Sequence, residues 1–181
     1  MFICNKGEKM SVRKMTNTEV MKLIKELEEQ KQLLIDFEKR NAFARYSQED
    51  KHLADVTPYD IVANNNAINS LDRDVRILKH LLNVANTTVF VPEFNMTIGQ
   101  CLVYMAQLTQ SINRYMSLAN TDKVTREASG YSRSSAEFKE ARYDVAIARE
   151  MLNVEKNNLS KLQMAIDKAN LTNEIDVPLG E

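Results

Sequence analysis

The clearest pattern in the chain is an apolar residue at every seventh position, which occurs in three stretches. In the first stretch two such columns run in parallel, three residues apart. Their members are Ile61, Ile68, Val75 and Leu82, and Asn64, Leu71, Leu78 and Ala85. A 3.5-residue period keeps one narrow stripe turned toward a partner helix. The pattern therefore predicts a helix with a coiled-coil seam.

The second and third stretches repeat the pattern. The second has columns of Ile98, Met105, Ile112 and Ala119, and of Cys101, Leu108 and Tyr115. The third has columns of Val145, Leu152, Leu159 and Ile166, and of Ala148, Leu162 and Ala169. Phe138 extends the last pattern upstream, so this helix is expected to begin between Ala136 and Asp144 and to end near Asn170. We take the apolar members of all three seams as candidate core or oligomer contacts.

An earlier helix is predicted from an amphipathic pattern without a strict repeat. Val20, Leu27 and Leu34 recur with Leu23 and Phe37 at mixed helical steps. This helix is expected to begin after Thr16 or Thr18 and to run to about Arg45.

Two later helix starts have capping signals. Thr57 is suited to the cap, Pro58 to the first helical position and Asp60 to the positive end of the helix dipole. Thr97 with Gln100 forms a capping box.

The lengths of these stretches predict an arrangement. Residues 61–85 and 98–119 are similar in length and close in sequence, so they are expected to form an antiparallel hairpin. Residues 87–94 between them are β-branched and aromatic and form either a short extended segment or a loop. The fold class expected is all-α, an antiparallel helical hairpin or coiled-coil bundle. One domain is expected over 16–175, with tails at 1–15 and 176–181.

Composition supports long helices and excludes several classes of protein. Only 4 Gly and 3 Pro in 181 residues leave few turns. A net charge of -1 gives no field that would attract nucleic acid or an anionic membrane. No apolar run reaches the length of a membrane span, so no stable membrane insertion is expected. Cys4 and Cys101 stand far apart, and no secretory signal is evident, which favours a reducing cytoplasm.

The sequence carries only weak signals for catalysis or ligand binding. His52 lies near Asp50 and Asp55 in a polar stretch, where a solvated loop is the simpler interpretation. His80 has no second ligand at helical spacing, and no phosphate-binding glycine motif exists. We therefore expect no catalytic residue, no cofactor, no metal and no identifiable small-molecule ligand.

Asparagine and glutamate at seam positions are better explained as assembly devices. Asn64 in a seam costs stability but fixes register, because another alignment would leave it unpaired. Glu155 is expected to act similarly if a basic residue faces it.

Several segments resemble a known family. Asn83 and Asn86 form an Asn-x-x-Asn, Thr97–Leu102 is similar to a Thr-Leu-x-Glu-Ala-Leu helix start, and Ala169–Thr172 is similar to Ala-Asn-Trp-Thr. A ligand or contact loop is suggested by a match to Tyr-Ser-Arg-Ser, namely Tyr131, Ser132, Arg133 and Ser134. These segments, spread over residues 71–175, resemble the septicolysin-like family of small, largely uncharacterised helical bacterial proteins.

The resemblance implies a hairpin-rich helical fold and oligomeric assembly, and it carries over no catalytic residue. Two positions depart from the family pattern. Leu171 replaces its tryptophan, and Ala136–Lys139 replaces an extended Ile-Lys-Phe-Val and is equally compatible with helix. The second departure leaves the start of the last helix open.

Three functional hypotheses follow. The first is a non-enzymatic, homo-oligomeric structural or scaffolding protein, because the seams offer more apolar columns than one hairpin covers. The second is a membrane-active, cytolysin-like protein, as the family name suggests. The third is a ligand-binding or enzymatic site at an oligomer interface, which requires that Tyr131, Arg133, His80 or Cys101 converge.

Overall fold

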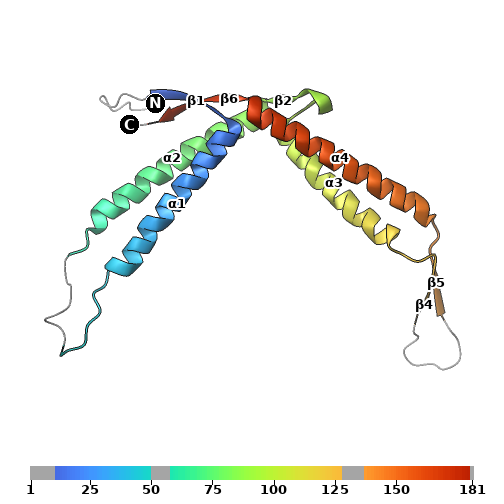
Figure 1. Cartoon of the computed structure of the whole chain (residues 1–181), viewed down its shortest axis with the longest axis horizontal. Coiled ribbons are helices and arrows are strands. Elements are labelled where there is room, and N and C mark those ends of the chain that lie inside the picture. Colours follow the sequence, from blue (N-terminus) through green and yellow to red (C-terminus); the bar gives the residue numbers. More distant parts are fainter. Residues whose placement is uncertain (1–10, 50–57, 128–136, 180–181) are drawn as a thin grey trace. The chain divides into compact units, whose positions relative to one another are not determined.

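The computed structural model describes residues 11–49, 58–127 and 137–179. Its helices are α1 (Asn17–Asn41), α2 (Ile61–Thr88), the short 3-10 helix η2 (Pro92–Phe94), α3 (Ile98–Ala119) and α4 (Val145–Thr172) (Figure 1). Its strands are β1 (Ser11–Thr16), β2 (Phe90–Val91), β3 (Met96–Thr97), β4 (Val124–Glu127), β5 (Glu137–Glu140) and β6 (Glu174–Leu179). The strands pair antiparallel as β1–β6, β2–β3 and β4–β5. The fold is thus mainly α with short antiparallel strands, and the extended segment expected within 87–94 is present as β2.

Polar caps set where the helices begin. Thr16 and Glu19 form a capping box at α1, and Thr97 and Gln100 form the predicted one at α3. The cap of α2 is Asp60 and not Thr57, since the Asp60 carboxylate accepts from the amides of residues 62 and 63 at 3.1 and 2.9 Å; Thr57 lies outside the described residues. Asp144 accepts from the amide of Ala146 at 2.8 Å, so α4 begins at Val145.

The chain divides into two compact units, where one domain over 16–175 was expected. One comprises Met1–Asn86 with Asn170–Glu181, and the other comprises Thr87–Ala169. Within the first unit α1 packs on α2, and within the second α3 packs on α4 (Figure 1). The expected pairing of 61–85 with 98–119 was therefore wrong. Helices whose seams have the same period can pair in more than one way. The polar contacts described next favour the observed pairs over the others.

The α1–α2 pair is antiparallel and joins an apolar half to a polar half. Its apolar core comprises Met15, Val20, Ile24, Val75, Leu78 and Val177, with Leu23, Leu27, Leu81, Leu82 and Ile175 packed around it. Two ion pairs also join the helices: Lys31 Nζ bonds Asp72 at 2.7 Å, and Lys79 Nζ bonds Glu28 at 2.6 Å. These bonds fix which turn of α1 faces which turn of α2.

The α3–α4 pair buries the predicted columns. Ile98, Cys101, Leu108 and Ile112 of α3 are buried, as are Ala148, Leu152, Leu162 and Ile166 of α4. Met105 and Leu159 pack against them, and Val145 is half-buried at the first residue of α4. At seam position Glu155 the partner is the Ser111 hydroxyl, which donates at 3.2 Å, and not a basic side chain.

Ile61 and Phe138 lie outside the buried seams, and α1 ends earlier than the predicted Arg45. Ile61 is 61% exposed, and Ile68 and Leu71 are only half-buried. The Lys31–Asp72 and Glu38–Asn64 bonds set the antiparallel alignment, which places Ile61 opposite a position just beyond the end of α1 at Asn41. Phe138 belongs to β5 and is exposed, so the helical column does not extend to it.

Segments expected as tails are partly structured. Residues 11–16 and 174–179 pair as β1 and β6, and Val177 is fully buried in the α1–α2 core. Asn17, also fully buried, holds this junction: its side chain donates to Asn170 at 3.1 Å and accepts from Asn173 at 2.8 Å. A buried amide costs free energy unless hydrogen-bonded, so this cluster specifies where the chain ends meet.

The Thr16 cap should contribute measurably to stability. Replacing it (Thr16→Ala) leaves an amide of the first turn unsatisfied and is expected to lower the free energy of unfolding by about 1 kcal/mol. Urea unfolding followed by circular dichroism measures this. Ser160→Ala, at an exposed position in α4, is the control and should cost nothing, because alanine is the better helix former. Equal losses in the two variants would show that the cap contributes nothing specific.

Candidate functional site

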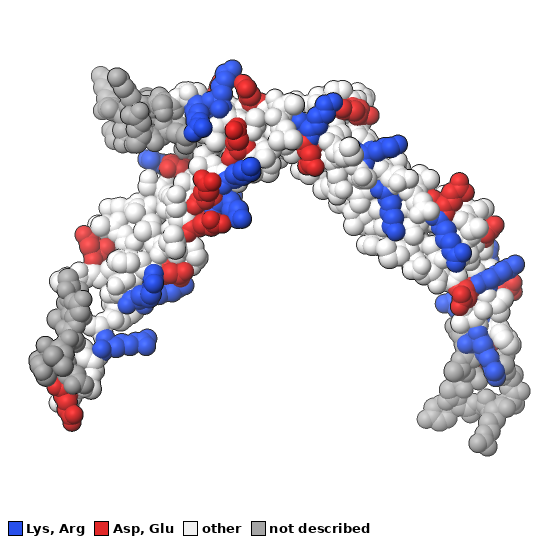
Figure 2. Space-filling model, in the orientation of Figure 1, with Lys and Arg blue, Asp and Glu red and all other residues white. Residues whose placement is uncertain are grey.

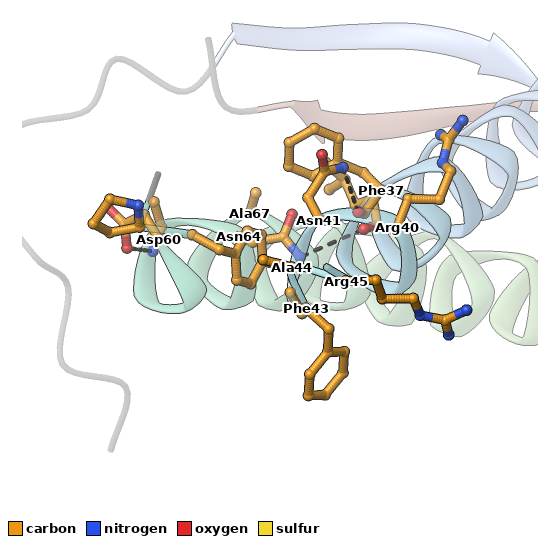
Figure 3. Close-up of a pocket in the computed structure, with 14 residues that line it drawn as sticks. Phe37, Arg40, Asn41, Phe43, Ala44, Arg45, Asp60, Asn64 and Ala67 are labelled. Carbon is orange, nitrogen blue, oxygen red and sulfur yellow. Dashed lines mark hydrogen bonds between the residues drawn. The ribbon is translucent and has the colours of Figure 1, made fainter. Parts of the chain in front are cut away.

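A groove lies where α1 ends and α2 begins. It has a volume of about 1050 Å³ and is lined by Leu34, Phe37, Arg40, Asn41, Ala42, Phe43, Ala44, Arg45, Pro58, Tyr59, Asp60, Ala63, Asn64 and Ala67 (Figure 3). All of these residues belong to the α1–α2 unit. The groove combines aromatic rings, four alanines and charges of both signs.

A hydrogen-bonded group fixes its floor. The Asn64 side-chain amide, which is buried, donates to Glu38 Oε2 at 3.1 Å and to the Leu34 carbonyl at 3.5 Å. The Tyr59 hydroxyl donates to the same Glu38 oxygen at 3.2 Å. Asn64 thus has the register-fixing role predicted from its seam position, since any shift would leave its amide and the Glu38 carboxylate without these partners.

The surroundings of Tyr59 shift its pKa. Burial raises the pKa of Tyr59 above its ordinary value, and the negative charge of Glu38 raises it further. The phenol therefore stays protonated at neutral pH and, together with the Asn64 amide, donates to the Glu38 carboxylate.

The rim is open and charged at both ends. Figure 3 shows Arg40 and Arg45 on one side of the groove and Asp60 on the other, with the Phe43 ring pointing away from the helices. Phe43 is 77% exposed although it lines the groove, and Phe37 approaches Tyr59 with 6.1 Å between ring centroids. Exposed aromatic side chains beside charged ones are common in surfaces that contact other macromolecules.

Of the residues considered for an enzyme, His80 and Cys101 do not line this groove. His80 is exposed on α2 in one unit, and Cys101 is buried on α3 in the other. Burial raises the pKa of the Cys101 thiol, which disfavours the nucleophilic thiolate. Tyr131, Ser132, Arg133, Ser134, Asp50, His52 and Asp55 lie outside the described residues.

Within residues 11–49, 58–127 and 137–179 no group of three or more His, Cys, Asp or Glu side chains is placed to hold a metal ion. In the same part of the chain, no helix has both the length and the apolar character needed to cross a bilayer.

Two motifs that carried the family resemblance serve the fold. Thr97 with Gln100 caps α3, and Asn170 bonds Asn17 in the buried amide cluster. Their presence is therefore explained by structure without any ligand.

Comparison with known proteins supports the fold and assigns no activity. No protein-family model matches the sequence, and neither does any curated protein. A crystal structure of a functionally unknown conserved protein from Corynebacterium diphtheriae is similar, with a TM-score of 0.61 and 19% identity over 90% of this chain and 99% of that chain. At this identity the likeness shows a shared fold alone.

Sequence reasoning missed most of the groove. Asn64 was identified, but Glu38, Tyr59 and the two arginines were not. A signal for Glu38 existed, because Ile24, Lys31 and Glu38 are seven residues apart and continue the α1 seam as charged members. Arg40 lies in the last turn of α1, outside the seam positions, and Phe43 and Arg45 follow the helix, where no periodicity marks them.

The raised pKa of Tyr59 predicts a pH dependence. A folded-state pKa above the unfolded value gives stability that is fully present below about pH 10 and is lost as pH rises through the folded pKa. The free energy of unfolding, measured by urea titration, should therefore fall less for Tyr59→Phe than for wild type between about pH 9.5 and 11.5. Lysine side chains titrate in the same range in both proteins, so their contribution cancels when the two unfolding free energies are subtracted.

Glu38→Gln is the companion variant. It removes the carboxylate charge but leaves the burial of Tyr59, so it should weaken the pH dependence only in part. Wild-type and Tyr59→Phe curves that run parallel over this range would contradict the assignment.

Proposed function

We propose that this chain is a non-enzymatic, self-associating helical protein with a structural or scaffolding role in the cytoplasm. The observation that carries the proposal is a second apolar stripe, outside the buried seam. On α4, Ile147, Met151 and Val154 are 55%, 45% and 51% exposed and follow one another by four and three residues. Such steps return to one face of a helix, so the three side chains form a continuous exposed patch.

The opposite flank of α4 is polar, which gives the helix two unlike sides. Arg149, Lys156 and Gln163 lie seven residues apart there and are exposed. Arg149 Nε donates to the carbonyl of Ala119 at 3.2 Å, so this flank is used within the unit. Solvation explains the polar flank, whereas nothing within the described part of the unit covers the apolar one.

The α1–α2 unit likewise has exposed apolar residues on one side and charged residues on the other. Leu33 and Phe37 on α1 are four residues apart, Ile77 and Val84 on α2 are seven apart, and all four are exposed. The Glu28–Lys79 ion pair lies on the other side of the seam. Figure 2 shows charged side chains gathered along one edge of this unit beside an uncharged expanse.

A second copy is the occupant that these stripes favour. A pair of helices buries only one stripe per helix, whereas four helices around a common core bury two or more, in coiled-coil-like packing. The same stripe on each copy is self-complementary under two-fold symmetry, and a net charge of -1 gives little repulsion between copies. The resemblance to the septicolysin-like family, which implies oligomeric assembly, points the same way, and the buried, free Cys101 suits a reducing compartment.

Light scattering coupled to size-exclusion chromatography tests the proposal directly. At about 50 μM the full chain is expected to elute with at least twice the 20.7 kDa mass of one copy. A folded species of monomer mass at this concentration would end the proposal.

Met151→Lys should weaken association. It places a charge within the exposed stripe and removes about 1.5–3 kcal/mol of apolar burial, which corresponds to at least about a tenfold rise in the dissociation constant. Asn153→Lys adds the same charge at an exposed position off the stripe and should associate as wild type. Equal behaviour of the two variants in sedimentation velocity would remove α4 from the interface.

A further inference from the structure

We propose that the groove at the end of the α1–α2 pair receives Phe43 of a second copy, and that the groove of this second copy receives Phe43 in return. The inference rests on the proposed self-association and deepens it by naming an anchor and its socket. Both lie on one patch, as a two-fold symmetric contact requires.

Phe43 has the properties of an anchor. It follows the end of α1 at Asn41, where the chain leaves the helix, and its ring is 77% exposed. Figure 3 shows the ring directed away from the groove that its own chain lines. A phenylalanine this exposed forgoes most of its burial free energy, which a partner surface would restore.

The groove has the properties of a socket. Ala63 and Ala67 present only methyl groups on an exposed turn of α2, while Leu34, Phe37 and Tyr59 supply apolar and aromatic surface. The hydrogen bonds of Asn64 and Tyr59 to Glu38 hold the floor in place before any partner arrives. A rigid socket lowers the entropic cost of binding a ring.

Charge favours a second copy over an unrelated occupant. Arg40 and Arg45 lie at one end of the groove and Asp60 at the other (Figure 3). A two-fold axis across the patch exchanges its ends, so each basic end meets the acidic end of the other copy. Two identical patches are thus complementary in charge as well as in shape.

The socket also continues the exposed stripe of the same unit. Phe37 belongs to the groove lining and, with Leu33, to the apolar residues of α1. On α2, Ile61 and Val62 are exposed and come directly before Ala63. A copy docked on Leu33 and Phe37 would therefore also contact the groove.

Two variants separate the anchor from the socket. Phe43→Ala removes the ring, and Ala67→Phe fills the groove from an exposed position. Each alone should raise the dissociation constant at least about tenfold, since both reciprocal contacts are lost. Phe138→Ala, which removes a ring that is 64% exposed in the other unit, and Ala146→Phe, at an exposed alanine of α4, are matched controls that should associate as wild type.

Mixing the two variants is the decisive experiment. A mixed dimer keeps one intact contact, because Phe43 of the Ala67→Phe copy enters the open groove of the Phe43→Ala copy. With copies of distinguishable mass, native mass spectrometry should detect the mixed dimer at concentrations where each variant alone is monomeric. Its dissociation constant should lie about tenfold below those of the single variants.

The outcomes are distinct. If wild type associates but the mixed dimer is no more stable than the single variants, this inference fails and the proposed self-association stands. If either variant associates as tightly as wild type, the anchor or the socket is wrong. If wild type itself is monomeric, the proposed function fails. Circular dichroism on every variant confirms that the helices are intact.

Discussion

Within each unit two long helices, α1 with α2 and α3 with α4, bury a narrow stripe against each other, and the rest of the architecture follows from that restriction. The stripe holds about two residues in seven, so most of each helix surface remains outside the seam. Polar side chains occupy much of that surface, but five of the exposed residues are apolar, namely Ile147, Met151, Val154, Leu33 and Phe37. The pairing of α1 with α2 and of α3 with α4 therefore accounts for the folding of each unit and leaves apolar surface over.

Because the seams are similar, polar residues within them decide the alignment. Lys31 with Asp72, and Asn64 with Glu38, lock α1 against α2 at chosen turns. Ser111 with Glu155 does the same for α3 and α4. A shift by one turn would keep apolar residues in contact but would break these bonds, and an unpaired polar group in a seam costs more than the pair contributes. Polar seam residues are thus the means by which near-equivalent packings are excluded.

The groove illustrates how such a device can also shape a surface. The Glu38 carboxylate binds Asn64 and Tyr59 and so fixes the floor beneath Ala63 and Ala67. α1 ends at Asn41, just beyond Glu38, and the groove at this end of the pair is lined by Phe43, Arg40 and Arg45. A structural group at a helix end therefore provides the contact site that we assign to self-association, and no acid–base role is needed to explain it.

The sequence alone determined the helices, most of their boundaries and most of the buried residues. Seven-residue columns such as Ile98–Ala119 report burial directly, because their period is that of the contact, and the Thr16 and Thr97 caps are local in sequence. Partner choice, the β1–β6 closure through Asn17, and the groove required the tertiary structure. These features depend on residues far apart in the chain, and a periodic pattern states which face of a helix is buried without stating what covers it.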